Sequence, residues 1–120
     1  MSKAARSVFV FGLYLVLLAI VLLVAPNFLL GLFFLPSTTE VWVRVVGMLV
    51  LFLGFYYVQA GRKELTDFFR WTMYPRSTVI LFFAAFVLLG FAKPPLILFG
   101  VVDLLGVIWT GVALRASKTT

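Results

Sequence analysis

Hydrophobic residues run almost without interruption along this chain, and charged residues occur only at a few places between the runs. No charged residue lies between Ser7 and Thr39. As one α-helix that segment would be about 50 Å long, whereas the hydrocarbon core of a bilayer is about 30 Å thick. Pro26 lacks a backbone donor and disfavours helical conformation at Ala25. The pattern therefore predicts a first membrane span over residues 7–25.

The apolar octet after this break, residues 28–35, is too short to cross a bilayer. Backbone groups in lipid must be paired, so we expect a short helix in the membrane interface, with a re-entrant loop as the alternative. Residues 37–40, Ser-Thr-Thr-Glu, are typical of a turn and helix N-cap. A second span is predicted over residues 41–60.

The next segment, residues 61–76, carries four basic and two acidic residues and is predicted to be a cytoplasmic loop. Its apolar positions recur at helical spacing, which indicates an interfacial or extended helix within it. A third span over residues 77–92 is short for a bilayer, unless the bilayer thins locally or the helix begins before Pro75. A fourth span is predicted over residues 95–114.

These patterns predict an all-α integral membrane protein with a single domain, residues 1–120. Four transmembrane helices form an up-down bundle, with a short interfacial helix after the first. Composition agrees, because 64% of the residues are hydrophobic and 12% are charged, against about 25% charged in soluble domains. The first apolar run is longer than that of a signal peptide, so we expect it to be retained.

Basic residues are distributed unequally between the two sides of this predicted bundle. Positively charged loops stay in the cytoplasm, so the side with more lysine and arginine is expected to be cytoplasmic. Eight basic residues fall on the side of the chain termini and two on the other side. Both termini are therefore predicted to be cytoplasmic. The basic residues sit at helix ends, as topology signals do, and we expect no nucleic-acid partner.

The chain contains no cysteine and no histidine. This excludes disulfides, thiolate nucleophiles and imidazole ligands, and we expect no metal, no cofactor and no enzymatic activity. Asp103 is the most unusual residue of the predicted spans, because it places a carboxylate about 12 Å inside the fourth span. A carboxylate at such a depth must be paired, protonated or hydrated.

Arg44, near the start of the second span, is the best candidate for an ion pair with Asp103, and Lys93 is the next. One interpretation is that Asp103 and Arg44 fix the register of two helices. The other is that Asp103 is a protonatable site for transport or ligand binding.

Small and polar residues mark one face on each of two predicted spans. Gly47 and Gly54 lie close to the stripe of Arg44, and Gly100, Gly106 and Thr110 share a face with Asp103. Small residues allow helices to approach closely in membranes, so we expect the second and fourth spans to pack against each other.

Hydroxyl groups in the cytoplasmic half could line a small pocket, and the alternative is an aromatic belt with interhelical hydrogen bonds. The candidates are Tyr14, Tyr57 and Thr110.

Several short segments resemble those of known membrane proteins. They are Ala25-Pro26-Asn27-Phe28-Leu29-Leu30-Gly31-Leu32, Glu40-Val41-Trp42-Val43-Arg44, Gly54-Phe55-Tyr56-Tyr57, Phe68-Phe69-Arg70-Trp71-Thr72 and Phe99-Gly100-Val101-Val102-Asp103-Leu104-Leu105-Gly106. With these segments the chain resembles small four-helix bacterial membrane proteins, distantly similar to the DoxX-like group. The resemblance implies a four-helix bundle in the bacterial inner membrane and transfers no catalytic residue.

Two functions are compatible with these features. The first is a non-enzymatic structural or accessory component that contacts the lipid bilayer and acts as a homo-oligomer or within a larger membrane complex, as the small-residue faces indicate. The second is a small transporter or a binder of a lipid, quinone or other hydrophobic ligand that uses Asp103.

Overall fold

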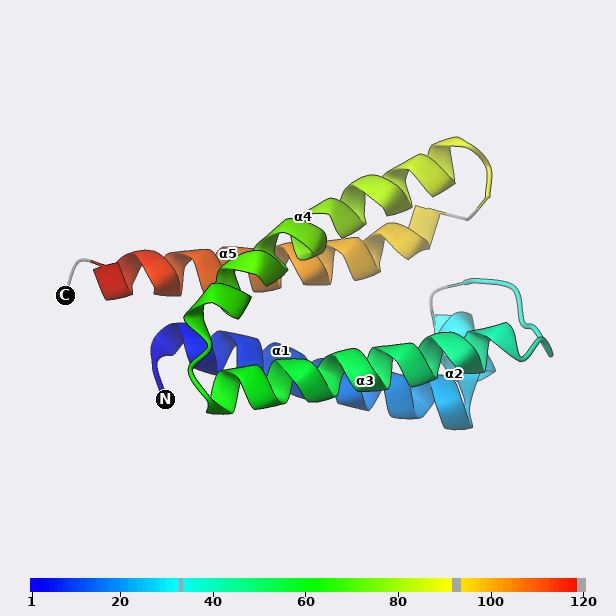
Figure 1. Ribbon diagram of the computed structural model, residues 1–120. Helices are drawn as coiled ribbons and strands as arrows, with labels where there is room; N and C mark the ends of the chain where they lie inside the picture. The colour runs from blue at the N-terminus through cyan, green and yellow to red at the C-terminus, as the bar shows by residue number, and fades with distance from the viewer. Residues whose placement is uncertain (33, 92–93, 119–120) are drawn as a thin grey trace.

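The chain folds into α-helices only, in a computed structural model that describes residues 1–32, 34–91 and 94–118 (Figure 1). The order of elements is α1 (Lys3–Val24), α2 (Pro26–Leu32), α3 (Trp42–Arg62), α4 (Thr66–Leu88), the 3₁₀-helix η1 (Pro94–Leu96) and α5 (Ile97–Lys118). The predicted all-α fold is confirmed, as is the short helix after the first span.

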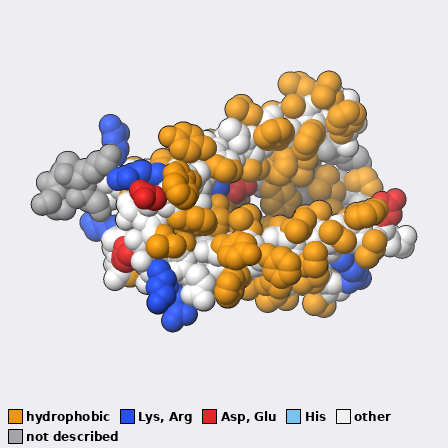
Figure 2. Space-filling model, in the orientation of Figure 1, with side chains coloured by type: hydrophobic (Ala, Val, Ile, Leu, Met, Phe, Trp, Pro, Cys, Tyr) orange, Lys and Arg blue, Asp and Glu red, His pale blue; other side chains and the backbone are white. Residues whose placement is uncertain are grey.

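Four segments are long and apolar enough to cross a membrane: α1, α3, α4, and Pro94–Ala116, which joins η1 to α5. By helix length and hydropathy the chain is a multi-pass membrane protein. Figure 2 shows the consequence on the surface, where hydrophobic side chains cover the middle of the molecule. Lysine and arginine side chains gather mainly at the end where the chain termini lie.

Local chemistry explains where α1 begins and ends. The hydroxyl of Ser2 accepts a hydrogen bond from the backbone N–H of Ala5, at 3.0 Å, and so caps the start of the helix. At the other end, the N–H of Ala25 bonds to the carbonyl of Val21. Pro26 then begins α2, where its missing donor has no cost because the first helical N–H groups have no intrahelical partner.

Helix α4 differs most from the sequence-based expectation. It begins at Thr66, within the predicted loop, and continues through Pro75 to Leu88. The alternative in which the helix begins before Pro75 is therefore the one found. Proline removes only its own N–H donor, and a helix already formed on both sides can tolerate that loss. The end of the predicted third span, residues 92 and 93, lies outside the described residues, as does residue 33.

The helices pack as two antiparallel pairs, α1 with α3 and α4 with α5, and α1 also packs on α5 (Figure 1). Helix α1 is therefore the element that holds the two pairs together. The prediction that the second and fourth spans pack face to face is wrong, because α3 packs mainly on α1.

Glycines allow α1 and α3 to approach almost to backbone contact. A Cβ atom on Gly12 would lie 2.9 Å from the backbone nitrogen of Val58, and one on Gly54 would lie 3.1 Å from the carbonyl oxygen of Gly12. A Cβ atom on Gly47 would lie 3.3 Å from the carbonyl oxygen of Ala19. Dispersion and close packing drive helix association in lipid, so these contacts hold the pair together.

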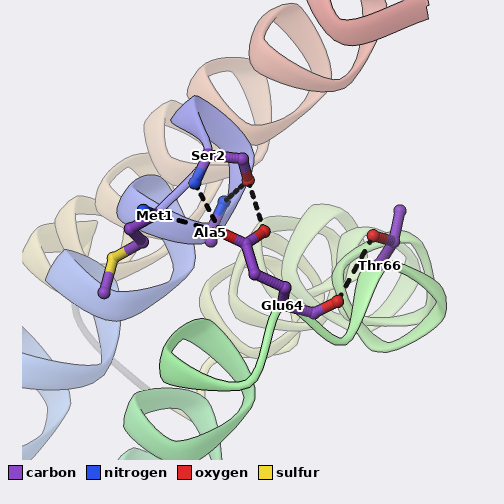
Figure 3. A network of polar contacts seen from close by, with 5 residues as sticks. All are labelled: Met1, Ser2, Ala5, Glu64 and Thr66. Atoms are coloured by element: carbon purple, nitrogen blue, oxygen red, sulfur yellow. Dashed lines mark hydrogen bonds and ion pairs between the residues drawn. The ribbon is translucent and has the colours of Figure 1, made fainter.

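Polar contacts tie the turn between α3 and α4 to the start of α1 (Figure 3). Glu64 accepts hydrogen bonds from the hydroxyl of Ser2 at 2.7 Å and from the Ser2 backbone N–H at 2.5 Å. These hydrogen bonds, led by that of the hydroxyl, hold the pKa of the Glu64 carboxyl below its usual value. The turn is thereby fixed beside the cap of α1.

The close contact between α1 and α3 can be tested with two matched glycine variants. We expect Gly12→Ala to lower stability by about 1–3 kcal/mol, because the added methyl group must push α3 away. Gly31→Ala, in α2, should leave stability unchanged or slightly higher, because no atom lies within 4 Å and alanine favours helix. Thermal unfolding in detergent, followed by tryptophan fluorescence, measures both. Equal shifts for the two variants would contradict this description of the interface.

Candidate functional site

Arg76 of α4 is buried between helices, with 3% of its surface exposed. Its Nε–H donates to the backbone carbonyl of Thr72, at 3.3 Å. Its Nη2 donates to two hydroxyls, that of Thr72 at 2.9 Å and that of Thr110 on α5 at 3.1 Å. One guanidinium group thus links α4 to α5.

The hydroxyl groups around Arg76 form a chain with a defined direction. Ser7 donates its single proton to the carbonyl of Ala4, at 2.7 Å. The 2.8 Å contact between Ser7 and Thr110 must then use the proton of Thr110, whose oxygen remains free to accept from Arg76. The chain runs from α4 through α5 to α1, and so connects both helix pairs.

Aromatic rings complete the surroundings of the guanidinium group. Its central carbon lies 5.0 Å from the ring centre of Phe11 and 5.6 Å from that of Tyr57, both within range of a cation–π interaction. Nη1 of Arg76 has no hydrogen-bond partner within the described residues. This atom would lie 3.3 Å from a Cβ on Gly106, which is one helical turn from Asp103. The unpaired amino group therefore faces the part of α5 that carries Asp103.

Asp103 is half-buried and lies close enough to Arg76 for the two charges to attract each other. No hydrogen bond or direct ion pair reaches its carboxylate from any residue that the structure describes. The carboxylate of Asp103 can thus accept a further hydrogen bond, and Nη1 of Arg76 can donate one.

Asp103 lines a cavity of about 410 Å³ to which every helix contributes. Apart from Asp103 and Tyr14, its lining is apolar. Leu18 and Leu22 come from α1, Leu29 and Leu30 from α2, Val43, Val46, Val50 and Leu53 from α3, Val79 and Phe83 from α4, and Leu96 and Phe99 from η1 and α5. The molecule is hollowed between the two helix pairs, at the end away from the chain termini (Figure 2).

A larger depression, of about 740 Å³, lies on the outer side of α1 and α3. It is lined by aliphatic and aromatic side chains such as Leu13, Phe52 and Phe55, without any charged residue. Lipid chains can fill such a surface without specific recognition. Among the described residues no cluster of three or more acidic, cysteine or histidine side chains could hold a metal.

Arg44 does not lie beside Asp103, and the predicted ion pair between them is wrong. Its guanidinium group donates instead to the carbonyl of Leu23, near the end of α1. The last carbonyls of a helix have no intrahelical partner and carry partial negative charge, so a nearby arginine binds there favourably. Lys93, the second candidate, lies outside the described residues.

The structure distributes the other predicted residues over several places. Tyr14 lines the cavity with Asp103, Tyr57 packs against the guanidinium group of Arg76, and Thr110 accepts its hydrogen bond. Gly100 lies against Ile80 of α4, and Gly106 against Phe11 of α1. These glycines therefore serve contacts of α5 with α4 and α1, not with α3.

Sequence reasoning missed Arg76, Thr72 and Ser7. Arg76 was assigned to the predicted cytoplasmic loop, residues 61–76, as its last residue. A signal was present, because Phe69, Thr72 and Arg76 recur at helical spacing and are all buried on one face of α4.

Comparisons with protein-family models, with curated proteins and with solved structures find no match. The resemblance to DoxX-like proteins is thus supported only at the level of four apolar helices.

The hydroxyl chain around Arg76 predicts a clear effect for one conservative substitution. Thr110→Val keeps the shape of the side chain but leaves Arg76 with one acceptor fewer, and we expect a loss of about 2 kcal/mol of stability. Thr78→Val is the matched control, because that hydroxyl is exposed and bonds only to a carbonyl of its own helix. Thermal unfolding in detergent compares the two. A Thr110→Val protein as stable as the control would show that the chain contributes nothing.

Proposed function

We propose that this protein is a non-enzymatic membrane protein that binds a lipid or another hydrophobic ligand in the cavity beside Asp103. The observation that carries this proposal is the half-buried carboxylate of Asp103, which lines an otherwise apolar cavity and has no hydrogen-bond or ion-pair partner among the described residues. Buried polar groups are normally hydrogen-bonded, so a partner from outside the chain is favoured at this position.

The charges at the site favour a ligand whose polar end is uncharged. In their ionised forms Asp103 and Arg76 attract each other and offset each other's charge. A charged headgroup would be left without compensation in a medium of low dielectric constant. A hydroxyl group fits better, because it can donate to the carboxylate of Asp103 without adding a charge. Tyr14 adds another hydroxyl at the same edge.

The size and lining of the cavity suit a hydrophobic ligand. Its volume of about 410 Å³ falls within the range of roughly 300–1,000 Å³ typical of small-molecule sites. Such sites are mostly apolar with a few placed polar groups, as this one is.

A structural role through self-association has weaker support. It was predicted from the small residues on the second and fourth spans. The space beside Gly47, Gly54 and Gly106 is filled by residues of α1, and the space beside Gly100 by Ile80 of α4. The close contacts that these glycines permit are therefore used within one chain.

We further propose that the protein lies in a bacterial inner membrane with both termini in the cytoplasm. The support is the excess of lysine and arginine at the end of the molecule that carries the termini.

This orientation can be tested directly because the chain contains no cysteine. Thr39→Cys and Thr66→Cys place single thiols at exposed positions on opposite sides of the bundle. A membrane-impermeant maleimide added to intact cells should label Thr39→Cys, whereas Thr66→Cys should react only after the membrane is opened. The reverse pattern would show that the termini face outward.

Ligand binding can be tested with a long-chain alcohol that carries a photoreactive diazirine, added to the protein in lipid vesicles. We expect cross-links on cavity residues such as Leu18 and Phe83. Val46→Trp, which fills the cavity, should reduce them about fivefold or more, corresponding to about 1 kcal/mol of binding. Leu49→Trp adds the same ring on a part of α3 that does not line the cavity, and should leave them unchanged.

Asp103→Asn separates the ligand role from a structural one. If Asp103 holds a ligand, the variant should unfold at nearly the same temperature and lose most of the cavity cross-links. A lower unfolding temperature with undiminished cross-links would assign Asp103 to the stability of the bundle. Cross-links confined to lipid-facing residues in every variant would contradict the proposed ligand site.

A further inference from the structure

A second site lies on the other side of α1, where a groove runs between α1 and α5. Its first part, of about 300 Å³, is lined by Lys3 and Arg6 together with Trp109 and small residues of α5. Its second part, of about 210 Å³, is lined by Val10, Tyr14 and Leu105, again with Trp109. Trp109 borders both parts, so the basic part and the apolar part are adjacent along α1 and α5 and are treated as one groove.

The residues of this groove that belong to α1 form one stripe along the helix. Residues 3, 6, 10 and 14 are three or four positions apart and therefore lie on one face. From Lys3 to Tyr14 the helix rises about 16 Å. One leaflet contributes about half of the roughly 30 Å hydrocarbon core. The groove as a whole, from Lys3 to Tyr14, thus has about the depth of a single leaflet, with its basic part at the leaflet surface.

Among the residues that the structure describes, no carboxylate is paired with the two cations of the groove. The chain contains four acidic residues. Glu64 is bonded to Ser2, Asp67 is paired with Arg70 at 3.6 Å, and Asp103 lines the cavity described above. The fourth, Glu40, precedes α3 at the opposite end of that helix from Glu64. Within the described part of the chain no ion pair or hydrogen bond reaches the side chains of Lys3 and Arg6.

The position of these cations is unfavourable for the helix itself. Lys3 and Arg6 lie in the first turn of α1, which carries no acidic residue. The N-terminus of a helix carries partial positive charge and favours anions. A bound anion would therefore interact favourably with the two side chains, in addition to the Glu64 carboxylate that already bonds to Ser2 at the cap of the helix.

We propose that the groove between α1 and α5 binds an anionic phospholipid of the leaflet on the side of the chain termini. Its phosphate lies between Lys3 and Arg6, and one acyl chain follows Trp109, Val10 and Leu105 toward Tyr14. The two cations favour an anionic headgroup. The apolar part of the groove favours a lipid over a free phosphate ion, because it can hold an acyl chain. This site is separate from the proposed cavity, although both include Tyr14.

The test uses Trp109 as a reporter in the full-length chain. Trp42 and Trp71 are exposed and can be replaced by phenylalanine, which leaves Trp109 as the only tryptophan. The protein is reconstituted into phosphatidylcholine vesicles with increasing fractions of phosphatidylglycerol that carries dibrominated, quenching acyl chains. Brominated phosphatidylcholine is measured in parallel. The quenching curves give the relative affinity of the two lipids for the surface beside Trp109.

We expect phosphatidylglycerol to bind beside Trp109 about tenfold more tightly than phosphatidylcholine. The double variant Lys3→Gln, Arg6→Gln should reduce this ratio to about one. The charge-conserving exchange Lys3→Arg, Arg6→Lys should retain it. Because all four substitutions affect exposed side chains, folding should be preserved in both variants.

A matched control removes two charges from the same end of the molecule but not from the groove, with Arg62→Gln and Lys63→Gln. Its preference for phosphatidylglycerol should stay near that of the wild type. Equal losses in the two double variants would show a general surface attraction and overturn the proposal. Equal quenching by both lipids in the wild type, or a preference that survives Lys3→Gln, Arg6→Gln, would overturn it as well.

Discussion

The buried guanidinium group of Arg76 is the constraint on which the arrangement of the helices depends. A charged group removed from water must find its partners within the protein. Arg76 finds them in Thr72 of its own helix, Thr110 of α5, and the rings of Phe11 and Tyr57. These contacts join the pair α4 and α5 to the pair α1 and α3. Beyond this point the pairs diverge, and the space between them is the cavity that α2 and η1 border (Figure 1).

The sequence predicted which segments leave water, but not which helices pack together. Long apolar runs and Pro26 were sufficient to locate the spans and the short helix α2. Helices in lipid are apolar on all sides, so the hydrophobic pattern does not identify the face that contacts a neighbour. Asp103 stood out because it interrupts such a run. The cation expected beside it was misassigned, because Arg44 instead binds the carbonyl of Leu23, and Arg76 was counted as part of a loop.

The proposed function follows from what the arrangement leaves unsatisfied. Asp103 lies near enough to Arg76 for their charges to attract, and its carboxylate retains hydrogen-bonding capacity toward an apolar space. On the other side of α1, no carboxylate of a described residue pairs with Lys3 or Arg6 at the start of a second apolar groove. Tyr14 borders both spaces. Helix α1 would thus separate a site for an uncharged polar group, deep in the bundle, from a site for an anionic headgroup at the membrane surface.

The most direct measurement is an experimental structure of the protein extracted together with its native lipids. We predict elongated density in the cavity between the two helix pairs, with a polar end within about 3 Å of the Asp103 carboxylate. The side chain of Arg76 should remain bonded to Thr72 and Thr110. A bundle in which α4 and α5 close onto α3, so that side chains fill the cavity and Asp103 pairs with a cation of the chain itself, would contradict a ligand site at this position.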